Sequence, residues 1–481
     1  MRQDFDETFD ELSEKLEDEE IKFIDFKVVD PIGKWRHITI PKSNFTREFL
    51  SRGIGFDGSS YGYSSVENSD MLLVPDLKTA KIEPTKSGDV FSVIGDIYRV
   101  DGSGEKRRFR HDPRSTIARS RDYLRNSEIA EDFLISPEFE FYLFDDARFS
   151  YGTTRGGFQM DSLELTNRAE EEPDARNLHP LANTGGYHAP RPGDSVMELR
   201  NRIVSLLERE GVPVKYHHHE VGGAGESEIE VEFNDLKTAS DNTLYIKHVV
   251  RIMANLSGMS ATFMPKPIND FPGNGMHLHQ YLVKDGDNLF SGNEYGGLSE
   301  LALFFVGGLL EHGKSLMGFT NPTTNSYKRL IPGHEAPVDF VFARSNRSAA
   351  VRIPGYVQSG GKRRVELRTI DATCNPYLAY SAVLMAGLDG IERELDPRDS
   401  GYGPIEENIY DLSEERKEKI KNAPNSLTGS LDALEEDHDY LLKGDVFEES
   451  QIKNWIRIKR EEAGLFNDRP HPFEFMLYYD L

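Results

Sequence analysis

Four short segments of this chain alternate charged and apolar residues with the two-residue period of a β-strand. They are residues 137–144, 228–233, 276–279 and 364–368. In the first segment, Glu138 and Glu140 fall on one face of the predicted strand. Phe139 and Phe141 fall on the opposite face. A chain that buries the apolar face of each strand must also place the charged face, and this requirement restricts the folds that it can adopt.

The charged faces carry glutamate, histidine and arginine, and almost no lysine. In the other three segments they hold Glu228, Glu230 and Glu232, then His277 and His279, then Arg364, Glu366 and Arg368. Such faces can cover the solvent side of a half-exposed sheet, or they can converge on a shared cavity. Arginine favours the cavity, because lysine is the usual solvent-facing cation and arginine binds phosphate or carboxylate through two hydrogen bonds.

Glutamates that converge on one cavity repel one another and become protonated unless a cation lies between them. Carboxylates with an occasional imidazole suit Mg²⁺ or Mn²⁺, and not zinc or copper. Divalent ions beside several arginines are the usual equipment of phosphoryl transfer. The strand pattern alone therefore predicts a metal-dependent enzyme that handles phosphate, and it leaves the acceptor open.

Charge and cysteine content limit the partners and the compartment. Of 481 residues, 82 are Asp or Glu and 57 are Lys or Arg, so the formal charge is −25. This charge argues against nucleic acid as a partner; it also fits solubility or adaptation to salt. Cys374 is the only cysteine, so a cytoplasmic location is expected. The longest apolar run, 301–310, is too short to span a bilayer, so no membrane association is expected.

The order of apolar and polar residues divides the chain into three parts. Residues 1–20 predict an amphipathic helix, because apolar residues recur at spacings of three and four. Residues 21–105 predict a small β-rich domain that ends at the Gly- and Ser-containing stretch 101–105. Residues 106–481 mix helical patterns with isolated strands. Within them, 150–194 is rich in Gly, Pro, Asn and Arg and predicts a long surface excursion.

A set of motifs closely resembles type I glutamine synthetase, in the family's order, from about Ile21 to the C-terminus. The motifs are residues 56–60, 137–140, 217–220, 224–228, 275–279, 321–329, 331–337, 344–349, 364–368 and 375–377. The resemblance implies an α+β fold with a β-grasp domain at 21–105 and a catalytic domain at 106–481, whose curved antiparallel sheet is flanked by helices. It also implies ATP-dependent ligation of ammonia to the γ-carboxylate of L-glutamate through γ-glutamyl phosphate, which yields glutamine, ADP and phosphate.

The resemblance implies two or more divalent ions per subunit, Mg²⁺ or Mn²⁺, with ATP as co-substrate. By motif position, the ion nearer glutamate takes Glu140, Glu220 and Glu228. The ion nearer the ATP phosphates takes Glu138, His277 and Glu366.

The same motifs imply positions for the organic substrates. Phe233 and His279 match positions that hold the adenine nucleoside. Arg347, Arg352 and Arg364 match phosphate and nucleotide contacts, and Arg347 is also expected to be catalytic. The glutamate-binding positions of the family are matched by Gly273, Arg329, Glu335 and Arg368. Pro272 replaces a residue whose amide commonly helps to hold the substrate amino group, which puts the affinity for glutamate in question.

Two carboxylates complete the expected chemistry. Glu335 matches the flap residue that closes over the acyl phosphate, which would hydrolyse if water reached it. Asp57 matches the residue that holds ammonium and takes a proton before the attack. In the family this aspartate comes from the small domain of the neighbouring subunit. On its own, an Asp-Gly pair such as this one is also typical of a turn.

Assembly and regulation also follow from the resemblance. The family forms a dodecamer of two stacked hexameric rings, with active sites between adjacent subunits. The apolar C-terminal residues 471–479 resemble the segment that tethers the rings. Tyr410 lies in a segment similar to the loop whose tyrosine is adenylylated in some relatives, although an ordinary exposed loop tyrosine fits the same sequence.

Three other functions compete with ammonia ligation. A γ-glutamyl-amine ligase shares the first step, but both Asp57 and Glu335 are retained here. A non-catalytic paralogue would keep the fold, but all six expected metal ligands are present. A guanidino kinase shares the architecture of the catalytic domain and does not carry the small domain with its Asp-Gly-Ser-Ser motif.

Overall fold

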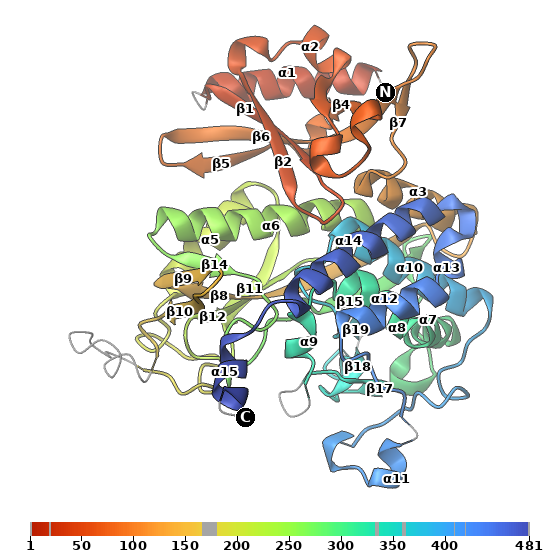
Figure 1. Ribbon diagram of the computed structural model, residues 1–481. Helices are drawn as coiled ribbons and strands as arrows, with labels where there is room; N and C mark the ends of the chain where they lie inside the picture. The colour runs from red at the N-terminus through yellow and green to blue at the C-terminus, as the bar shows by residue number, and fades with distance from the viewer. Residues whose placement is uncertain are drawn as a thin grey trace.

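The computed structural model describes residues 2–18, 21–165, 180–331, 336–357, 362–407, 409–418 and 420–479. A small N-terminal domain sits on one side of a larger domain, and the C-terminal helix lies at the far end of the molecule (Figure 1). None of the helices in this part of the chain combines the length and the hydropathy that crossing a bilayer requires.

The small domain is a mixed sheet covered by the N-terminal helix. Its strands are β1 (Phe23–Val29), β2 (Trp35–Pro41), β3 (Ile54–Asp57), β4 (Asp70–Pro75), β5 (Lys81–Thr85), β6 (Gly88–Val100) and β7 (Lys106–Arg108). The order is β2-β1-β6-β4-β3, β5 and β7 also pair with β6, and β1 runs parallel to β6. Helix α1 (Arg2–Asp18) buries Phe9 and Leu16 in the core of this sheet, and α2 (Arg47–Arg52) follows β2.

The large domain is built on one long curved sheet. Its strands are β8 (Asp132–Phe144), β11 (Val214–His219), β12 (Glu226–Val231), β13 (Asn234–Asp235), β14 (Ser260–Thr262), β15 (Leu278–Lys284), β16 (Asp287–Asn288), β17 (Asp339–Arg344), β18 (Ala349–Ile353) and β19 (Val365–Leu367). The main order is β11-β12-β8-β15-β19-β18-β17. These neighbours run antiparallel except β17 and β18, which are parallel. A separate hairpin joins β9 (Asp146–Tyr151) to β10 (Gly156–Asp161).

Helices cover the sheet and form most of the remaining volume (Figure 1). They are α3 (Pro113–Asn126), α5 (Met197–Arg209), α6 (Leu236–Leu256), α7 (Glu300–Glu311), α8 (Gly313–Thr320), α9 (Ser326–Arg329), α10 (Pro376–Glu392), α11 (Glu414–Lys417), α12 (Leu427–Glu436), α13 (Asp439–Leu442), α14 (Glu449–Asn467) and α15 (Pro472–Tyr478). The expected α+β fold, a β-grasp domain followed by a domain with a curved sheet and flanking helices, is confirmed.

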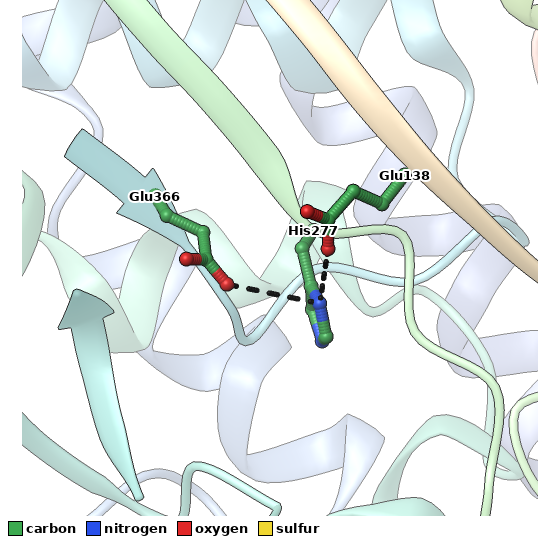
Figure 2. A group of neighbouring side chains, drawn as sticks. All are labelled: Glu138, His277 and Glu366. Atoms are coloured by element: carbon green, nitrogen blue, oxygen red, sulfur yellow. Dashed lines mark hydrogen bonds and ion pairs between the residues drawn. The ribbon is translucent and has the colours of Figure 1, made fainter. Parts of the chain in front are cut away.

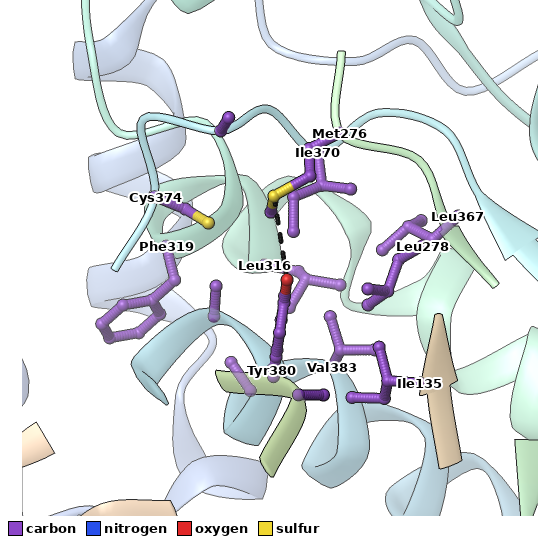
Figure 3. Close-up of a cluster of buried hydrophobic side chains, with 14 of the residues drawn as sticks. Ile135, Met276, Leu278, Leu316, Phe319, Leu367, Ile370, Cys374, Tyr380 and Val383 are labelled. Carbon is purple, nitrogen blue, oxygen red and sulfur yellow. Dashed lines mark hydrogen bonds between the residues drawn. The ribbon is translucent and has the colours of Figure 1, made fainter. Parts of the chain in front are cut away.

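The apolar core fixes the strands that carry the charged residues. Met276 and Leu278, on either side of His277, are fully buried, and Leu367 beside Glu366 is 3% exposed. Figure 3 shows these side chains packed with residues of α8 and α10, where the Tyr380 hydroxyl lies 3.7 Å from the Met276 sulfur. Because alternate residues of a strand point to opposite faces, burial of this apolar set turns His277 and Glu366 to the other side.

Buried ion pairs join the two domains. Arg114 in α3, with no exposed side-chain surface, donates to Asp96 of the small domain at 2.6 Å and to Asp76 at 3.1 Å. It also donates to both carboxylate oxygens of Asp241 in α6, at 3.0 and 2.8 Å. The pKa of Asp241 is lowered because, although burial acts to raise it, the charges of Arg114 and of a neighbouring lysine act more strongly. These pairs fix α3 and α6 against the small sheet.

The small sheet extends further than the sequence indicates, and one of its strands is more buried. Residues 101–105 form the turn between β6 and β7, so strand pairing continues to Arg108. In β1 the polar residues Asp25 and Lys27 are buried like their apolar neighbours. Lys27 donates to Glu83 at 2.5 Å, and His248 of α6 also contacts Glu83 at 2.9 Å. The large domain therefore covers the face that an isolated sheet would expose.

The expected surface excursion, 150–194, lies only partly on the surface. The hairpin β9–β10 exposes Phe149 and Phe158, as expected for a surface element. Glu164 and Asp194, by contrast, are 1% and 5% exposed and reach into the large domain. Part of the excursion, residues 166–179, falls outside the described chain. Composition indicated a loop, but it gave no sign that two acidic residues of the loop have buried basic partners.

Candidate active site

Most of the charged faces predicted from the sequence meet in one cavity of about 260 Å³ in the large domain. Its acidic lining consists of Glu138, Glu140, Glu220, Glu226, Glu228 and Glu366. Its basic and aromatic lining consists of His218, His277, Arg329, Arg347, Arg352, Arg368, Tyr187, Tyr216 and Tyr356. Gly273 also lines it. The convergence that the strand pattern predicted is therefore what the structure shows.

Strand register places the acidic residues next to one another. In the pairing of β12 with β8, Glu228 lies opposite Glu140, and Glu230 lies opposite Glu138. Like charges directly opposite each other destabilise a sheet. Two such pairs side by side on neighbouring strands are therefore unfavourable on their own, and positive charge is needed to offset their repulsion.

Glu138, His277 and Glu366 form the first compact group, and they come from three different strand segments (Figure 2). The Nδ1 atom of His277 lies 2.9 Å from Glu138 and 3.8 Å from Glu366. Each residue offers one possible metal ligand, and these atoms lie within 4.8 Å of one another. The group suits a divalent cation that accepts oxygen and nitrogen ligands.

Two arginines hold Glu366 at this group. Arg352 donates to one carboxylate oxygen at 2.5 Å, and Arg368 donates to the other at 2.6 Å. Burial acts to raise the pKa of Glu366, but the positive charges around it, led by Arg368, lower it to about 2. Glu366 is therefore ionised and fixed in position at neutral pH.

His218, Glu220 and Glu228 form a second compact group, whose possible ligand atoms again lie within 4.8 Å of one another. Glu140 faces Glu228 across the strand pair. Burial raises the pKa of Glu220 to about 9, and the charges of Glu228 and Glu140 contribute further. The pKa of Glu228 is also raised, by burial and then by the charges of Glu138 and Glu140. At this second group the protein therefore places several carboxylates together without enough positive charge to neutralise them.

His279 lies behind the first group and has no exposed surface. Arg364 donates from Nε to Nδ1 of His279 at 3.2 Å, so Nδ1 is the acceptor. The Nε2 atom of His279 lies 2.6 Å from Glu138 and donates to it. Phe233 is half-buried near the same arginine, whose guanidinium lies 5.7 Å from the ring centre. The structure thus links both residues to Arg364, and their contact with a nucleoside stays a prediction.

Arg329 and Gly273 also line the cavity, and a guanidinium nitrogen of Arg329 lies 3.4 Å from Nε2 of His277. Arg329 donates to the backbone carbonyls of Thr369 at 2.9 Å and Arg368 at 3.1 Å, and these bonds fix its guanidinium. A Cβ atom on Gly273 would lie 2.4 Å from the carbonyl oxygen of Pro265, so only glycine allows this close approach. The glycine therefore allows the backbone to pack closely against Pro265 and the side chain of Arg329.

Asp57 lies at the end of β3 in the small domain, outside the described lining of the cavity. It is exposed and accepts hydrogen bonds from Ser59 N at 2.9 Å, Ser59 Oγ at 2.7 Å and Ser60 Oγ at 2.7 Å. The bonds from Ser59 and Ser60 lower the pKa of Asp57 to about 2. Within one chain, this aspartate is therefore an anion at the surface of the small domain.

Two expected residues are not described. Glu335 falls in residues 332–335, outside the described chain. The backbone of Tyr410 belongs to the short 3-10 helix Ile409–Asp411, but its side chain is outside the description. The roles expected of both stay predictions.

Sequence reasoning missed several residues of the cavity and misplaced one. Glu232 is exposed and follows β12, so it does not share the cavity face with Glu228. Glu226 takes that place and is 1% exposed. Extending the two-residue period backward from Glu228 finds Glu226. The role of His218, the middle residue of the triple histidine, becomes visible only when β11 is paired with β12.

Comparison with known proteins places these features in one family. A family model described as the catalytic domain of glutamine synthetase matches residues 110–478, and a model described as its β-grasp domain matches residues 20–100. Curated relatives named glutamine synthetase come from Frankia alni (41% identity; 97% of this chain and 98% of the relative covered), Aquifex aeolicus (42%; 98% and 99%) and Escherichia coli (40%; 97% and 98%).

Solved structures agree with the sequence matches. A cryo-EM structure of Plasmodium falciparum glutamine synthetase has a TM-score of 0.85 at 26% identity, and the match covers 98% of both chains. A complex of GmaS with ADP has a TM-score of 0.80 at 27% identity, and the match covers 98% of this chain and 99% of that one. Both matches extend across the small domain, the curved sheet and the acidic cavity.

Proposed function

This chain belongs to the glutamine synthetase family, and we propose that its acidic cavity joins ammonia to the γ-carboxylate of L-glutamate with the use of ATP. γ-Glutamyl phosphate is the intermediate, and glutamine, ADP and phosphate are the products. The observation that carries the proposal is the strand register, which sets Glu228 beside Glu140 and Arg352 beside Glu366 in one cavity. Carboxylates for cations and arginines for phosphate thus line the same space.

The donor set fits two divalent ions, Mg²⁺ or Mn²⁺. Burial first, and then the charges of neighbouring carboxylates, raise the pKa values of Glu220 and Glu228, and a hard divalent cation stabilises the ionised form of both. We assign Glu140, Glu220 and Glu228 to the ion nearer glutamate. We assign Glu138, His277 and Glu366 to the ion nearer ATP. When bound, such ions neutralise phosphate oxygens and polarise the transferring phosphoryl group.

We assign the ATP phosphates to Arg347, Arg352 and Arg364. Arg347 and Arg352 line the cavity, and Arg364 bonds the hydroxyl of Tyr356, another lining residue, at 3.2 Å. Arginine suits this task, because its planar guanidinium binds phosphate oxygens in pairs. The solved complex of GmaS with ADP supports a nucleotide in this fold. Phe233 and His279 are assigned to the nucleoside end.

We assign glutamate to the part of the lining formed by Arg329, Arg368 and Gly273. The two guanidinium groups supply positive charge for its carboxylates, and both are held by backbone carbonyls. Pro272 uses its own carbonyl to accept a bond from Tyr142 at 2.9 Å. It has no side-chain donor or acceptor for the substrate amino group. Glu335 is assigned to the closing flap, as a prediction.

We propose that Asp57 of a neighbouring subunit completes each site. Its pKa of about 2 keeps it ionised at neutral pH, so that it attracts ammonium. Burial against another subunit raises the pKa of a carboxylate, which brings Asp57 closer to accepting a proton. Because the Asp57 of the same chain lies outside the cavity lining, this role requires a second chain.

The proposed assembly is a dodecamer of two hexameric rings in the cytoplasm. The exposed apolar side chains of α15 support a tether between rings, because Phe473, Phe475, Met476 and Leu477 are 51–81% exposed in the single chain. The tail lies beside the β9–β10 hairpin, where Tyr151 and Phe475 line one shallow hollow. Tyr410 is kept as a predicted modification site.

The test measures phosphate release with ATP, Mg²⁺ and glutamate, and compares ammonium, methylamine and putrescine as acceptors. We expect turnover with ammonium. Replacing Asp57 by alanine should lower that turnover by about 100-fold or more, because a positioned base contributes on this scale. Glutamate affinity should not change, because the residues assigned to glutamate, Arg329, Arg368 and Gly273, line the cavity and Asp57 of the same chain does not.

The matched control is Asp101→Ala. Asp101 accepts from Ser103 N at 2.9 Å in the β6–β7 turn, so it repeats the local geometry of Asp57 at another surface site. This variant should keep full turnover. Turnover with putrescine alone would show that the protein is an amine ligase instead. No phosphate release with any of the amines would show that it is a non-catalytic paralogue.

A further inference from the structure

A buried carboxylate lies behind the second metal-type group, in a segment that sequence analysis predicted to be on the surface. Glu164 lies between β10 and α5 and is 1% exposed. One of its oxygens accepts from Ser195 N at 2.9 Å and from Ser195 Oγ at 2.7 Å. The other accepts from Gly225 N at 2.5 Å and from His219 Nε2 at 2.9 Å. A buried carboxylate with this many donors is held firmly in place.

The second oxygen of Glu164 joins both ends of the connection between β11 and β12. His219 is the last residue of β11, and Gly225 immediately precedes β12. The Nδ1 atom of His219 lies 2.7 Å from the backbone carbonyl of Glu220 and donates to it. Glu164 therefore reaches the backbone of Glu220 through a single imidazole ring, and it also fixes the far end of the loop that carries Glu220.

Residues 181–188 of the excursion pack against the same loop or against Glu164. Gly186 N donates to the carbonyl of Val221 at 2.9 Å, and His188 N donates to that of His219 at 3.0 Å. A Cβ atom on Gly186 would lie 2.5 Å from the carbonyl oxygen of Glu220, so glycine allows the two segments to meet. Leu181 N donates to the carbonyl of Glu164 at 2.9 Å, which ties this strip of chain to the anchor.

We propose that Glu164 is a positioning residue for the metal ligand Glu220, which makes Glu164 and residues 181–188 a structural support of the active site. The proposal rests on the proposed function, because it takes Glu140, Glu220 and Glu228 as ligands of one ion. These carboxylates face one another across the second group and repel. A ligand under repulsion keeps its place only if its backbone is held, and Glu164 holds it at both ends of the loop.

The test measures Mn²⁺ binding to the assembled, metal-free protein by isothermal titration and by electron paramagnetic resonance. Groups that orient metal ligands typically change metal affinity by about 10- to 100-fold when they are removed. Glu164→Ala should therefore weaken one class of Mn²⁺ site by about 10-fold or more. The other class of Mn²⁺ site, at Glu138, His277 and Glu366, should keep its affinity for Mn²⁺. The affinity of the protein for ATP should also stay unchanged. A general loss of structure would weaken both classes together.

The matched control is Glu198→Ala. Glu198 lies in the first turn of α5, near Ser195, and makes an exposed ion pair with Arg191 at 2.6 Å, so its loss should leave both classes unchanged. If Glu164→Ala does not assemble, Glu164→Gln has nearly the same size, and the same selective weakening is expected of it.

Glu220→Gln separates the two ways of failing. If Glu220→Gln leaves both Mn²⁺ classes intact, the assignment of the metal ligands is wrong, and the proposed function loses its metal site. If Glu220→Gln removes one class while the Glu164 variants bind both classes as tightly as the wild type, the positioning role of Glu164 is wrong and the proposed function stands.

Discussion

At the scale of single residues, His312 shows how a buried charge network makes stability depend on pH. Its Nε2 atom lies 2.8 Å from Asp389 of α10, and its Nδ1 atom lies 2.9 Å from Asp437. The ring also stacks on Tyr440, with 4.0 Å between ring centres. Burial acts to lower the pKa of His312, but the hydrogen bonds to the two aspartates raise it to about 9.

This raised pKa gives a prediction for His312→Asn. Between the unfolded pKa of about 6.5 and the folded pKa of about 9, the folded protein binds more protons than the unfolded chain. The stabilisation is therefore complete below pH 6.5 and is lost as the pH rises through 9. We expect the variant to be less stable than the wild type by about 3 kcal/mol at pH 6, with a smaller difference at pH 9.

Melting temperatures of both proteins at several pH values between about 6 and 9.5 check this expectation. A difference that does not change with pH would mean that packing against Tyr440, and not the charge of His312, accounts for the stabilisation.

The candidate site could be predicted residue by residue only where local periodicity carries the information. Glu138, Glu140 and Glu228 follow from the two-residue period, because a strand exposes alternate residues on one face. Glu164 has no such signal, since its partners Ser195 and Gly225 lie 31 and 61 residues further along the chain. Contacts of this kind depend on tertiary packing, which a single sequence does not encode locally.

At the scale of elements, the arrangement of strands was harder to predict than their existence. Strand β8 pairs with β15, whose residues lie about 140 positions further along the chain, and the parallel β17–β18 pair is flanked by antiparallel neighbours. Apolar alternation marks each strand but does not choose its partner. The family resemblance supplied the curved sheet, whereas the pattern alone supplied only charged strand faces.

The contact between elements of the two domains gives a prediction for Arg114. Replacing Arg114 by alanine removes the buried guanidinium that Asp76, Asp96 and Asp241 share; Asp241 is buried, and Asp76 and Asp96 are half-buried. Removing one partner of a buried ion pair typically costs about 3 to 5 kcal/mol. We expect a loss of this size in the free energy of unfolding, measured by urea denaturation.

Arg52→Ala is the control for a surface pair. Arg52 and Glu48 are each 74% exposed, so their separation should change the free energy of unfolding by about 0.5 kcal/mol at most. Equal effects of the two substitutions would show that the Arg114 network does not hold the domains together.

At the scale of the whole molecule, the tail offers the clearest test of assembly. Helix α15 carries apolar side chains that remain exposed in the single chain, and burying them against another ring is favourable. Deleting residues 474–481 should therefore leave single rings. Mass photometry should then report about half the mass of the full-length assembly.

The control keeps the tail and alters another exposed helix, for example Glu414→Ala in α11, which should leave the mass unchanged. A truncated protein with the full mass would show that other surfaces join the rings. Activity of the truncated protein is expected to persist, because the proposed sites lie between neighbours within a ring.

The buried ion pairs around Arg114 also bear on how substrates enter. Since Arg114 links α3 and α6 to the small sheet, its ion pairs oppose a hinge opening between the two domains of one chain. If Asp57 of an adjoining subunit completes the site, as proposed above, access to the cavity also depends on where that subunit places its β3. Under that proposal catalysis requires the ring, and an isolated subunit is expected to show no ammonium-dependent turnover.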